Sequence, residues 1–335
     1  MKRALLFAAA LLAATPATPA LAWGNTGHRI VGVLAMRALP AGLPAFLRAP
    51  QAAADAGELS REPDRSKQAG RVHDSDRDPG HFLDLGDDGT VFGGPSLKAL
   101  PGTRADYEKA LQAVGQNSWN AGYLPYSIIA SYQQLTKDFA FWRVLDAAER
   151  NPAWAVRRAW FRADKRRREA QILQDIGALS HFVGDGSQPL HVTIHYNGWG
   201  DFPNPDGYAT AKLHGPFEGD LVRASVSQAA VAARMTPPRR CDRGVEHCVA
   251  DYLAATGALV IPFYQLEKAG GLSPGNPRGP ALATQQLAVA ASELRDLIDD
   301  AWSASLRQTV GWNPIPVTEV LAGRVDPYAA LRGVD

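Results

Sequence analysis

The sequence predicts an all-α protein, and two patterns carry that prediction. Apolar residues recur at helical spacing through long segments, of which NTGHRIVGVLAMRAL at 25–39 is a clear example. Segments in which apolar and polar residues alternate with a period of two, as in half-buried strands, are scarce. The chain has 335 residues, and 46% of them are hydrophobic, which is enough for a sizeable core. We therefore expect one multi-helix domain with long functional loops.

Two irregular segments separate the expected helices. Helical patterns cover 25–39, 41–60 with proline interruptions, 104–116, 125–150, Pro152 to about Val183, 216–235, 245–268 and 278–308. The segment 61–103 is rich in Asp, Gly and Pro, as loops are, and 195–212 is a second irregular insert. Loops of this length are uncommon in compact domains unless they are functional or disordered.

The N-terminus has the pattern of an export signal. Lys2 and Arg3 precede the apolar run LLFAAALLAA, which is too short for a stable membrane anchor. The segment ends in Ala20-Leu21-Ala22, the small-x-small pattern of a signal-peptidase site. We expect residues 1–22 to be a signal peptide and 23–335 to be a single domain, exported to the periplasm or the medium. An uncleaved anchor is the alternative.

The mature chain carries little net charge. Without residues 1–22 it has 33 basic and 34 acidic residues, so it lacks the overall basic footprint of many nucleic-acid-binding proteins. A polyanion would have to bind at a local site. No later segment has about 18 uninterrupted apolar residues, so we expect no transmembrane segment in the mature chain. The sequence indicates no protein partner.

The two cysteines, Cys241 and Cys248, lie close together in CDRGVEHC. An even number of closely spaced cysteines in an exported chain predicts one small disulfide loop. The alternative is a zinc site made by the pair. It is the weaker interpretation, because the histidine and carboxylate clusters lie elsewhere and export favours oxidation.

A metal-ligand pattern stands where a helix is expected to end, in SHFVGDGSQPLHV. Residues four apart share one face of a helix, so His181 and Asp185 should point the same way. Gly186 and the Gln188-Pro189 pair should end the helix, so that the chain can bring His191 to the same point. Imidazole and carboxylate groups are ordinary zinc ligands. The alternative is a polar helix end with a capping aspartate.

Two more clusters have metal-ligand character. In LHGPFEGD, His214 precedes a helix start and Glu218 could swing to meet it. An acidic group that complements the helix dipole explains Glu218 but not His214. At the mature N-terminus, WGNTGHR, the free amine and the carbonyl of Trp23 could chelate a metal that His28 completes. For Trp23 the alternative is a simple aromatic core anchor.

The long loop supplies a fourth cluster, Asp64 and His81, in PDRSK and PGHFLDL. His and Asp in a loop of an otherwise helical protein favour a functional interpretation. Asp74, Asp76 and Asp78 lie nearby as rival carboxylates, although they resemble a solvated charge run.

These motifs, WGxxGH, PD, GHFLD, HFVGDGSQPLH and HxxxE, resemble the superfamily of trinuclear-zinc phosphodiesterases. That superfamily contains the single-strand-specific nucleases of the S-one/P-one type and the bacterial zinc-dependent phospholipases C. The resemblance spans residues 23–220 and implies an all-α fold with three Zn²⁺ ions. It implies that one zinc is held by Asp64, His81, His181 and Asp185, a second by His191, His214 and Glu218, and a third by Trp23 and His28, with Asp185 bridging.

The two branches of this superfamily give different expectations for the substrate. WGNTGH and GHFLD resemble the nucleases, whereas Glu218 in HGPFE resembles the phospholipases C. We favour an endonuclease-like enzyme that acts on single-stranded nucleic acid or 3′-nucleotides, with phospholipid cleavage as the alternative. A non-catalytic zinc-binding protein is a lesser alternative, because three side-chain ligands at one zinc leave an open position, as in catalytic sites.

The resemblance also gives expectations for groups around the metals. Asp64 and Asp84 are the candidate catalytic carboxylates, with Asp84 orienting His81 or a water. A metal-activated water would attack phosphorus without a covalent intermediate. Phe82 and Trp199 are candidates to stack on a base or an acyl surface, with core packing as the alternative for each. Asn197 is a candidate to line the cleft.

Overall fold

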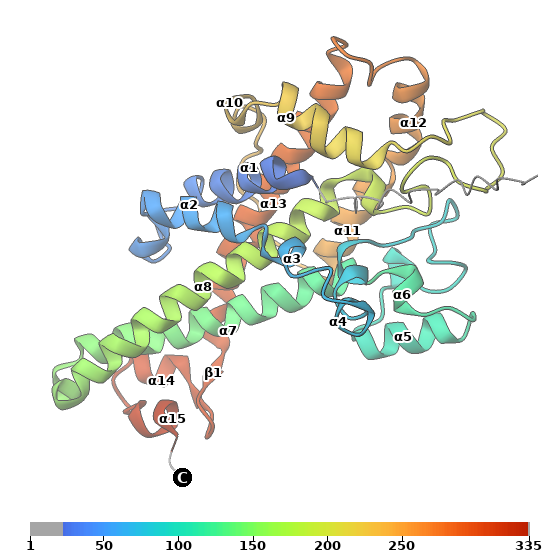
Figure 1. Cartoon of the computed structure of the whole chain (residues 1–335). Coiled ribbons are helices and arrows are strands. Elements are labelled where there is room, and N and C mark those ends of the chain that lie inside the picture. Colours follow the sequence, from blue (N-terminus) through green and yellow to red (C-terminus); the bar gives the residue numbers. More distant parts are fainter. Residues whose placement is uncertain (1–22, 334–335) are drawn as a thin grey trace, which may run out of the picture.

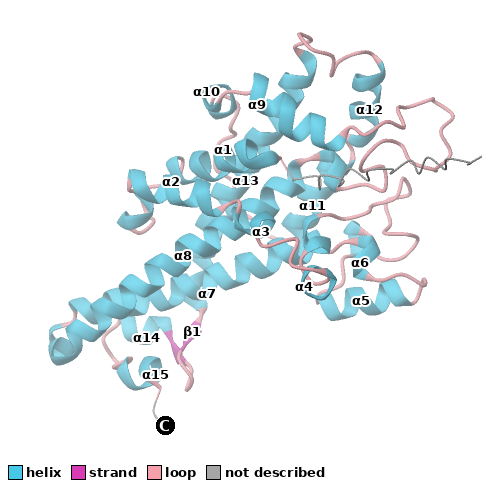
Figure 2. Cartoon of the chain, in the orientation of Figure 1, coloured by secondary structure: helices cyan, strands magenta, loops and turns pink. Residues whose placement is uncertain are grey.

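The protein is mostly helical, as predicted, with 65% helix and 3% strand (Figure 2). The structure is a computed structural model and describes residues 23–333. The predicted signal peptide falls on 1–22, outside the described residues. The α-helices are α1 (Gly24–Arg37), α2 (Pro50–Leu59), α3 (Glu62–Arg65), α4 (Arg71–Asp74), α5 (Arg104–Gln112), α6 (Ser118–Ala121), α7 (Leu124–Arg150), α8 (Arg158–Ser187), α9 (Val222–Ser225), α10 (Gln228–Ala232), α11 (Val245–Gly257), α12 (Val260–Lys268), α13 (Arg278–Ala304), α14 (Val317–Leu321) and α15 (Tyr328–Arg332).

The remaining elements are short. Single helical turns are η1 (Ala45–Arg48), η2 (Asp78–His81), η3 (Leu97–Ala99), η4 (Pro152–Arg157), η5 (Pro189–His191), η6 (Pro216–Leu221) and η7 (Ser305–Arg307). All are 3₁₀ turns except η6, which is a π-helical turn. Strands β1 (Thr309–Val310) and β2 (Ile315–Pro316) pair antiparallel, with Thr309 opposite Pro316.

Two long helices, α7 and α8, form the spine of the molecule. They lie side by side as an antiparallel pair, and α1, α2 and α13 pack against α8 near its C-terminal end (Figure 1). Proline in the first turn of α7 suits that position, because the first N–H groups of a helix have no partner within it. The main core lies between these helices and α11, and includes Val31, Ile176 and Leu294.

The C-terminal end of α8 differs in detail from the sequence prediction. The helix runs four residues beyond Val183 to Ser187, so Gly186 lies inside it rather than ending it. A Cβ added at Gly186 would lie 2.8 Å from the Tyr252 ring, so this glycine allows close helix packing. The extended backbone of Gln188 ends the helix, and its side chain accepts a hydrogen bond from the Leu190 amide in the following turn.

Other segments also differ from the prediction, and the segment 61–103, expected to be irregular, contains α3 and α4. The first turn after Pro152 is the 3₁₀ turn η4, in which Trp154 leaves helical geometry. The helix expected over 216–235 is divided into η6, α9 and α10. The elements after residue 308 were not predicted, because a two-residue strand and a five-residue helix are too short to show periodicity.

A second, smaller core lies at the other end of the α7–α8 pair. Val144 and Phe161 of that pair pack there against Val310 of β1 and Val317 of α14. Figure 1 shows α14, α15 and β1 beside this end, away from α1 and α12. The C-terminal elements therefore cover the part of the pair that the main body leaves exposed.

Within residues 23–333, one segment, Val245–Lys268, is long and apolar enough to cross a membrane by length and composition. In the structure it is divided into α11 and α12, and 44% of its most apolar window is buried against the rest of the chain. Buried core helices have the same composition, so this segment is weak support for a membrane span.

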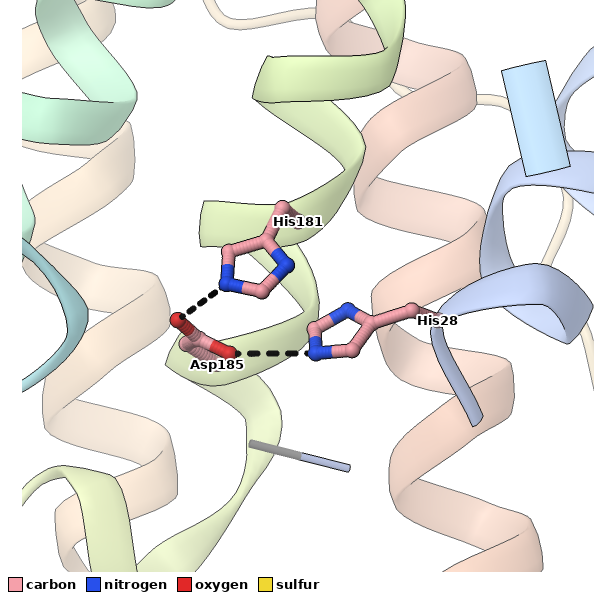
Figure 3. Close-up of side chains that lie close together, drawn as sticks. All are labelled: His28, His181 and Asp185. Carbon is pink, nitrogen blue, oxygen red and sulfur yellow. Dashed lines mark ion pairs between the residues drawn. The ribbon is translucent and has the colours of Figure 1, made fainter. Parts of the chain in front are cut away.

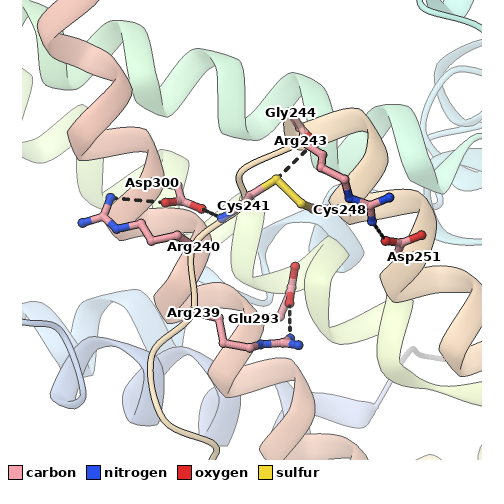
Figure 4. Close-up of a disulfide and its surroundings, with 9 residues drawn as sticks. All are labelled: Arg239, Arg240, Cys241, Arg243, Gly244, Cys248, Asp251, Glu293 and Asp300. Carbon is pink, nitrogen blue, oxygen red and sulfur yellow. Dashed lines mark hydrogen bonds and ion pairs between the residues drawn. A yellow bond between two sulfur atoms is a disulfide. The ribbon is translucent and has the colours of Figure 1, made fainter.

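The disulfide prediction is confirmed, because Cys241 and Cys248 are bonded to each other (Figure 4). The loop that they close lies against α13, where the Cys241 amide donates a hydrogen bond to Asp300 at 2.8 Å. Both cysteines are therefore used in the disulfide and are not part of a zinc site.

A pair of acids lies between α7 and α8. Asp138 is fully buried and accepts hydrogen bonds from Arg168 and Gln134. Burial, together with the neighbouring Asp138 carboxylate, raises the pKa of Asp175 to about 8. Asp175 is therefore protonated in the folded chain at pH values where the unfolded chain is ionised.

This pair predicts a pH-dependent effect of Asp175→Asn. The folded pKa lies above the unfolded value, so the wild-type protein loses stability as pH rises from about 4 to about 8. The amide has no such loss. We expect the variant to gain on the order of 1–2 kcal/mol over wild type at pH 8.5, after allowance for solvent screening, and less at pH 5. Urea unfolding at both pH values measures this, and a pH-independent difference would contradict it.

Candidate metal centre

Three groups of potential metal ligands lie around the C-terminal end of α8. They contain eight of the nine predicted ligand residues, and within each group the ligand atoms lie within 4.8 Å of one another. The groups are His28 with His181 and Asp185, Asp64 with His81 and His181, and His191 with His214 and Glu218. In residues 23–333, these are the groups of three or more His, Cys, Asp or Glu side chains that fit this criterion.

The first group joins α1 to α8 (Figure 3). His181 and Asp185 lie one turn apart on the same helix face, as predicted, with 3.3 Å between the His181 Nε2 and an Asp185 oxygen. The other Asp185 oxygen lies 3.5 Å from the His28 Nε2. The rings of His28 and His181 stack with centroids 4.0 Å apart. Asp185 of α8 thus lies close to His28 of α1, although the two helices are far apart in the sequence.

The second group shares His181 with the first and adds two residues from the long loop. Asp64 Oδ1 lies 3.8 Å from the His181 Nε2 and 3.9 Å from the His81 Nδ1. The His81 Nδ1 is also 3.1 Å from an Asp185 oxygen. These distances make the first two groups one continuous cluster. Lys67, which the sequence analysis did not select, forms an ion pair with Asp64 at 2.7 Å.

Of the carboxylates considered in the long loop, Asp64 is the one that reaches this cluster. Asp74 pairs instead with His73 and accepts hydrogen bonds from the amides of Ala69 and Gly70. It therefore stabilises the local turn. The geometry supports the choice of Asp64 over Asp74 among the candidate ligands.

The third group lies where the second irregular insert returns to the body. Glu218 lies 2.8 Å from the His214 Nε2, one helical turn earlier, and 3.5 Å from the His191 Nε2. The Gln188 side-chain amide donates a hydrogen bond to the same Glu218 oxygen at 3.1 Å. Thus Gln188 both ends α8 and holds a carboxylate of this group.

Backbone carbonyls orient three of the imidazole rings. The Nδ1 atoms of His181, His191 and His214 lie 2.8, 2.6 and 2.8 Å from carbonyl oxygens, and each donates to its carbonyl. The acceptors are Ser60, His81 and Tyr196. A proton on Nδ1 leaves the lone pair of Nε2 directed into the cluster, which is the arrangement found for metal-binding histidines.

A second observation indicates that these residues suit a metal ion. Several of their buried polar atoms have no hydrogen-bond partner. Both ring nitrogens of His28, one oxygen of Asp185 and one of Glu218 are in this state. The Nε2 atoms of His191 and His214 face each other at 3.0 Å, where two lone pairs would repel. An unsatisfied buried polar group costs about 1–3 kcal/mol. Bound cations would satisfy these atoms.

Burial also sets the protonation of the cluster. It lowers the pKa of His28 and of His181 to about 4, so both imidazoles are neutral near pH 7. Burial raises the pKa of Asp185 to about 7, because a charge there loses its hydration. Neutral imidazoles and a carboxylate that ionises near neutral pH are suitable ligands for a divalent cation.

Trp23 lies at the start of α1, beside the third group. Its ring is fully buried, and its indole N–H donates a hydrogen bond to Ser187 at 2.8 Å. The side chain is therefore an aromatic core anchor, as the alternative interpretation held. Its carbonyl accepts from the Gly27 amide at 3.1 Å. The predicted role of its amine depends on cleavage before residue 23 and stays a prediction.

The predicted role of Asp84 has no contact to support it. Among residues 23–333, no hydrogen bond or ion pair joins Asp84 to His81, whose ring lies instead beside Asp185 and Asp64. Burial raises the pKa of Asp84 to about 7. The predicted role of Asp84 toward His81 or a water stays a prediction.

The predicted substrate residues have different surroundings. Trp199 is 4% exposed and stacks on His195 at 3.7 Å, so its packing alternative holds and it is not a surface platform. Phe82 is partly buried, and its carbonyl accepts from the Leu124 amide. The Asn197 side chain accepts from the His214 amide at 3.2 Å, so Asn197 positions a predicted ligand.

A scan against protein-family models found no match for the chain, and a search of curated proteins found none either.

From this cluster we predict that Asp185→Asn weakens metal binding without impairing folding. The amide keeps the shape but removes the buried charge, so the metal-free variant should be at least as stable as wild type at pH 8. Zinc at 100 times its Kd should stabilise wild type by about 2.7 kcal/mol and the variant by much less. Thermal unfolding with and without zinc measures this.

The exposed Asp88 gives a matched control, since Asp88→Asn removes the same charge outside the cluster. It should leave the zinc-dependent shift unchanged. An Asp185→Asn protein with the wild-type metal content and the wild-type shift would contradict the assignment.

Proposed function

We propose that this protein is an exported zinc-dependent phosphodiesterase of the trinuclear-zinc superfamily, acting on single-stranded nucleic acid or 3′-nucleotides. The observation that carries the proposal is the meeting of eight predicted ligand residues in three adjoining groups. These residues come from α1, α3, η2, α8, η5, η6 and the residues just before η6, which are scattered through the first two thirds of the sequence. A structural role alone does not explain so many buried, unpartnered polar atoms.

The proposed ligands follow from these groups. Asp64, His81, His181 and Asp185 would hold one zinc, and His191, His214 and Glu218 a second. The main chain of Trp23 with His28 would hold a third, with Asp185 shared. Zinc ions held there would supply Lewis acidity toward phosphoryl oxygens and lower the pKa of a water.

The chain's own groups have separable tasks in this proposal. The carbonyls of Ser60, His81 and Tyr196 fix three imidazoles so that no reorganisation is needed during turnover. Lys67, 13% exposed beside Asp64, is a cation that can pair with a substrate phosphate oxygen. The group of His191, His214 and Glu218 offers three ligands rather than four, which favours catalysis over a structural site.

Phospholipid cleavage is the second candidate, and one further observation favours it. A groove of about 400 Å³ begins at Val192 and Thr193, directly after His191. Its lining is largely apolar and includes Leu85, Ala254 and Ile261. Such a surface near the third group could take an acyl chain. The groove also contains Asp87 and Lys98, so its lining is mixed.

A side-by-side assay tests the proposed function. The untagged chain from Trp23 would be loaded with zinc and given single-stranded DNA, RNA or phosphatidylcholine, each with and without EDTA. We expect EDTA-sensitive release of 5′-nucleotides. Release of phosphocholine alone would support the second candidate. Full activity in EDTA would refute the zinc mechanism, and no turnover with zinc bound would favour a structural metal site.

The N-terminus gives a separate prediction. One extra residue before Trp23 turns its amine into an amide, which is a poor metal ligand, while leaving every side chain in place. We expect the extended protein to bind one metal fewer per chain and to lose activity by about 100-fold or more. Metal analysis and turnover measure this, with a C-terminal extension of the same length as control. Undiminished turnover would contradict the assignment of the Trp23 main chain as a metal ligand.

A further inference from the structure

The distal end of the α7–α8 pair forms an arm that the metal centre does not use. We call residues 143–169 and 305–333 the basic arm; they comprise the connected ends of α7 and α8 with the C-terminal elements packed on them (Figure 1). The arm has its own hydrophobic core. Arg158 precedes His181 by 23 residues along one helix and therefore lies about 35 Å from the metal centre, whereas Glu169, at the near end of the arm, lies about 18 Å from it.

Charge divides unevenly between the arm and the body. The arm contains 12 basic and 6 acidic residues, whereas the rest of residues 23–333 contains 21 basic and 27 acidic residues. The near-neutral net charge of the chain is therefore the sum of a positively charged arm and a negatively charged body. A positive field confined to one end of a molecule attracts and orients a polyanion.

Three arginines form a ridge along the exposed side of α8. Arg158, Arg162 and Arg166 are spaced by four residues, so they follow one another along the same helix face, and all three are exposed. Like charges at this spacing destabilise a helix. Arg162 pairs with Glu149 at 2.7 Å. The Arg166 side chain has no ion pair or hydrogen bond to another residue in the part of the chain that the structure describes.

The composition of the arm suits a phosphate chain better than a bilayer. Of its basic side chains, all but Lys165 are arginines, whose planar guanidinium groups bind phosphate with two hydrogen bonds. Its two most exposed large apolar residues, Val156 and Trp312, lie in η4 and in the turn between β1 and β2, and not on an apolar face of an α-helix. Membrane-surface helices need such a face. An exposed tryptophan is also a stacking surface for a base.

We propose that the basic arm binds the backbone of single-stranded nucleic acid, through the Arg158–Arg162–Arg166 ridge, at a site separate from the metal centre. Long strands would be held by the arm while one part of the strand reaches the cluster. Short substrates would gain nothing from it. Binding to the arm requires no metal, so it can be tested whether or not the proposed hydrolysis is correct.

The test measures affinity without turnover. The full mature chain in EDTA is titrated into a fluorescein-labelled thymidine 30-mer, and anisotropy gives Kd from 20 to 200 mM NaCl. In the triple variant Arg158→Gln, Arg162→Gln and Arg166→Gln we expect Kd to rise at least 10-fold at 50 mM NaCl. The slope of log Kd against log salt should fall by about 2, since each phosphate contact on a single strand contributes about 0.7.

Two controls separate the ridge from general charge effects. Arg223→Gln, Arg243→Gln and Arg278→Gln together remove the same charge from exposed positions on the body, and should keep Kd within twofold of wild type. The triple lysine variant of the ridge should keep the salt slope. All variants should unfold in one cooperative transition, with only the small shift in midpoint that a change in surface charge gives.

Three results would overturn the proposal. The first is no binding of the 30-mer by the wild-type protein, and the second is wild-type affinity in the ridge variant. The third is a wild-type protein that binds phosphatidylglycerol vesicles but not the 30-mer, together with a ridge variant that no longer binds the vesicles. That result would assign the arm to a membrane surface.

Discussion

The buried carboxylate of Asp185 is the interaction on which the arrangement of the site depends. One oxygen faces His28 on the first helix, and the other faces His181 on its own helix and His81 from the long loop. A carboxylate at this depth is costly unless it is neutralised or paired. The three imidazoles around it are kept neutral by the same burial. Folding thus brings three segments to one acid whose charge they do not fully compensate.

At this site the requirements of stability and of the proposed metal binding conflict. The core that brings α1 and α8 together also removes water from polar atoms that then have no partner. A chain selected only for stability would replace such groups by apolar ones, often at no cost. The cluster is therefore the kind of local inconsistency that marks a binding site.

The sequence allowed much of this to be predicted, and the reasons for the failures are local. His181 and Asp185 were placed correctly because their spacing is a property of any helix. The disulfide followed from two cysteines with no competing partners. The same reasoning failed at Gly186, since a glycine inside a helix and one at its end look alike in sequence. It also failed to identify Lys67 and the carbonyl acceptors, because backbone atoms carry no residue signal and an ion pair depends on the path of the loop.

If the chain is cleaved before Trp23, as we propose, the burial of this residue limits where the cut can fall. Its ring donates to Ser187 at the end of α8 and lies 5.6 Å from Phe217 in η6, so it fills the space between two elements that carry candidate ligands. A chain cut one residue later would begin at Gly24 and lack that ring. Loss of a buried tryptophan costs about 3–5 kcal/mol, a large part of the stability of a domain. Under the proposed export, a cut after Trp23 would therefore yield a chain that folds less stably than one cut before it.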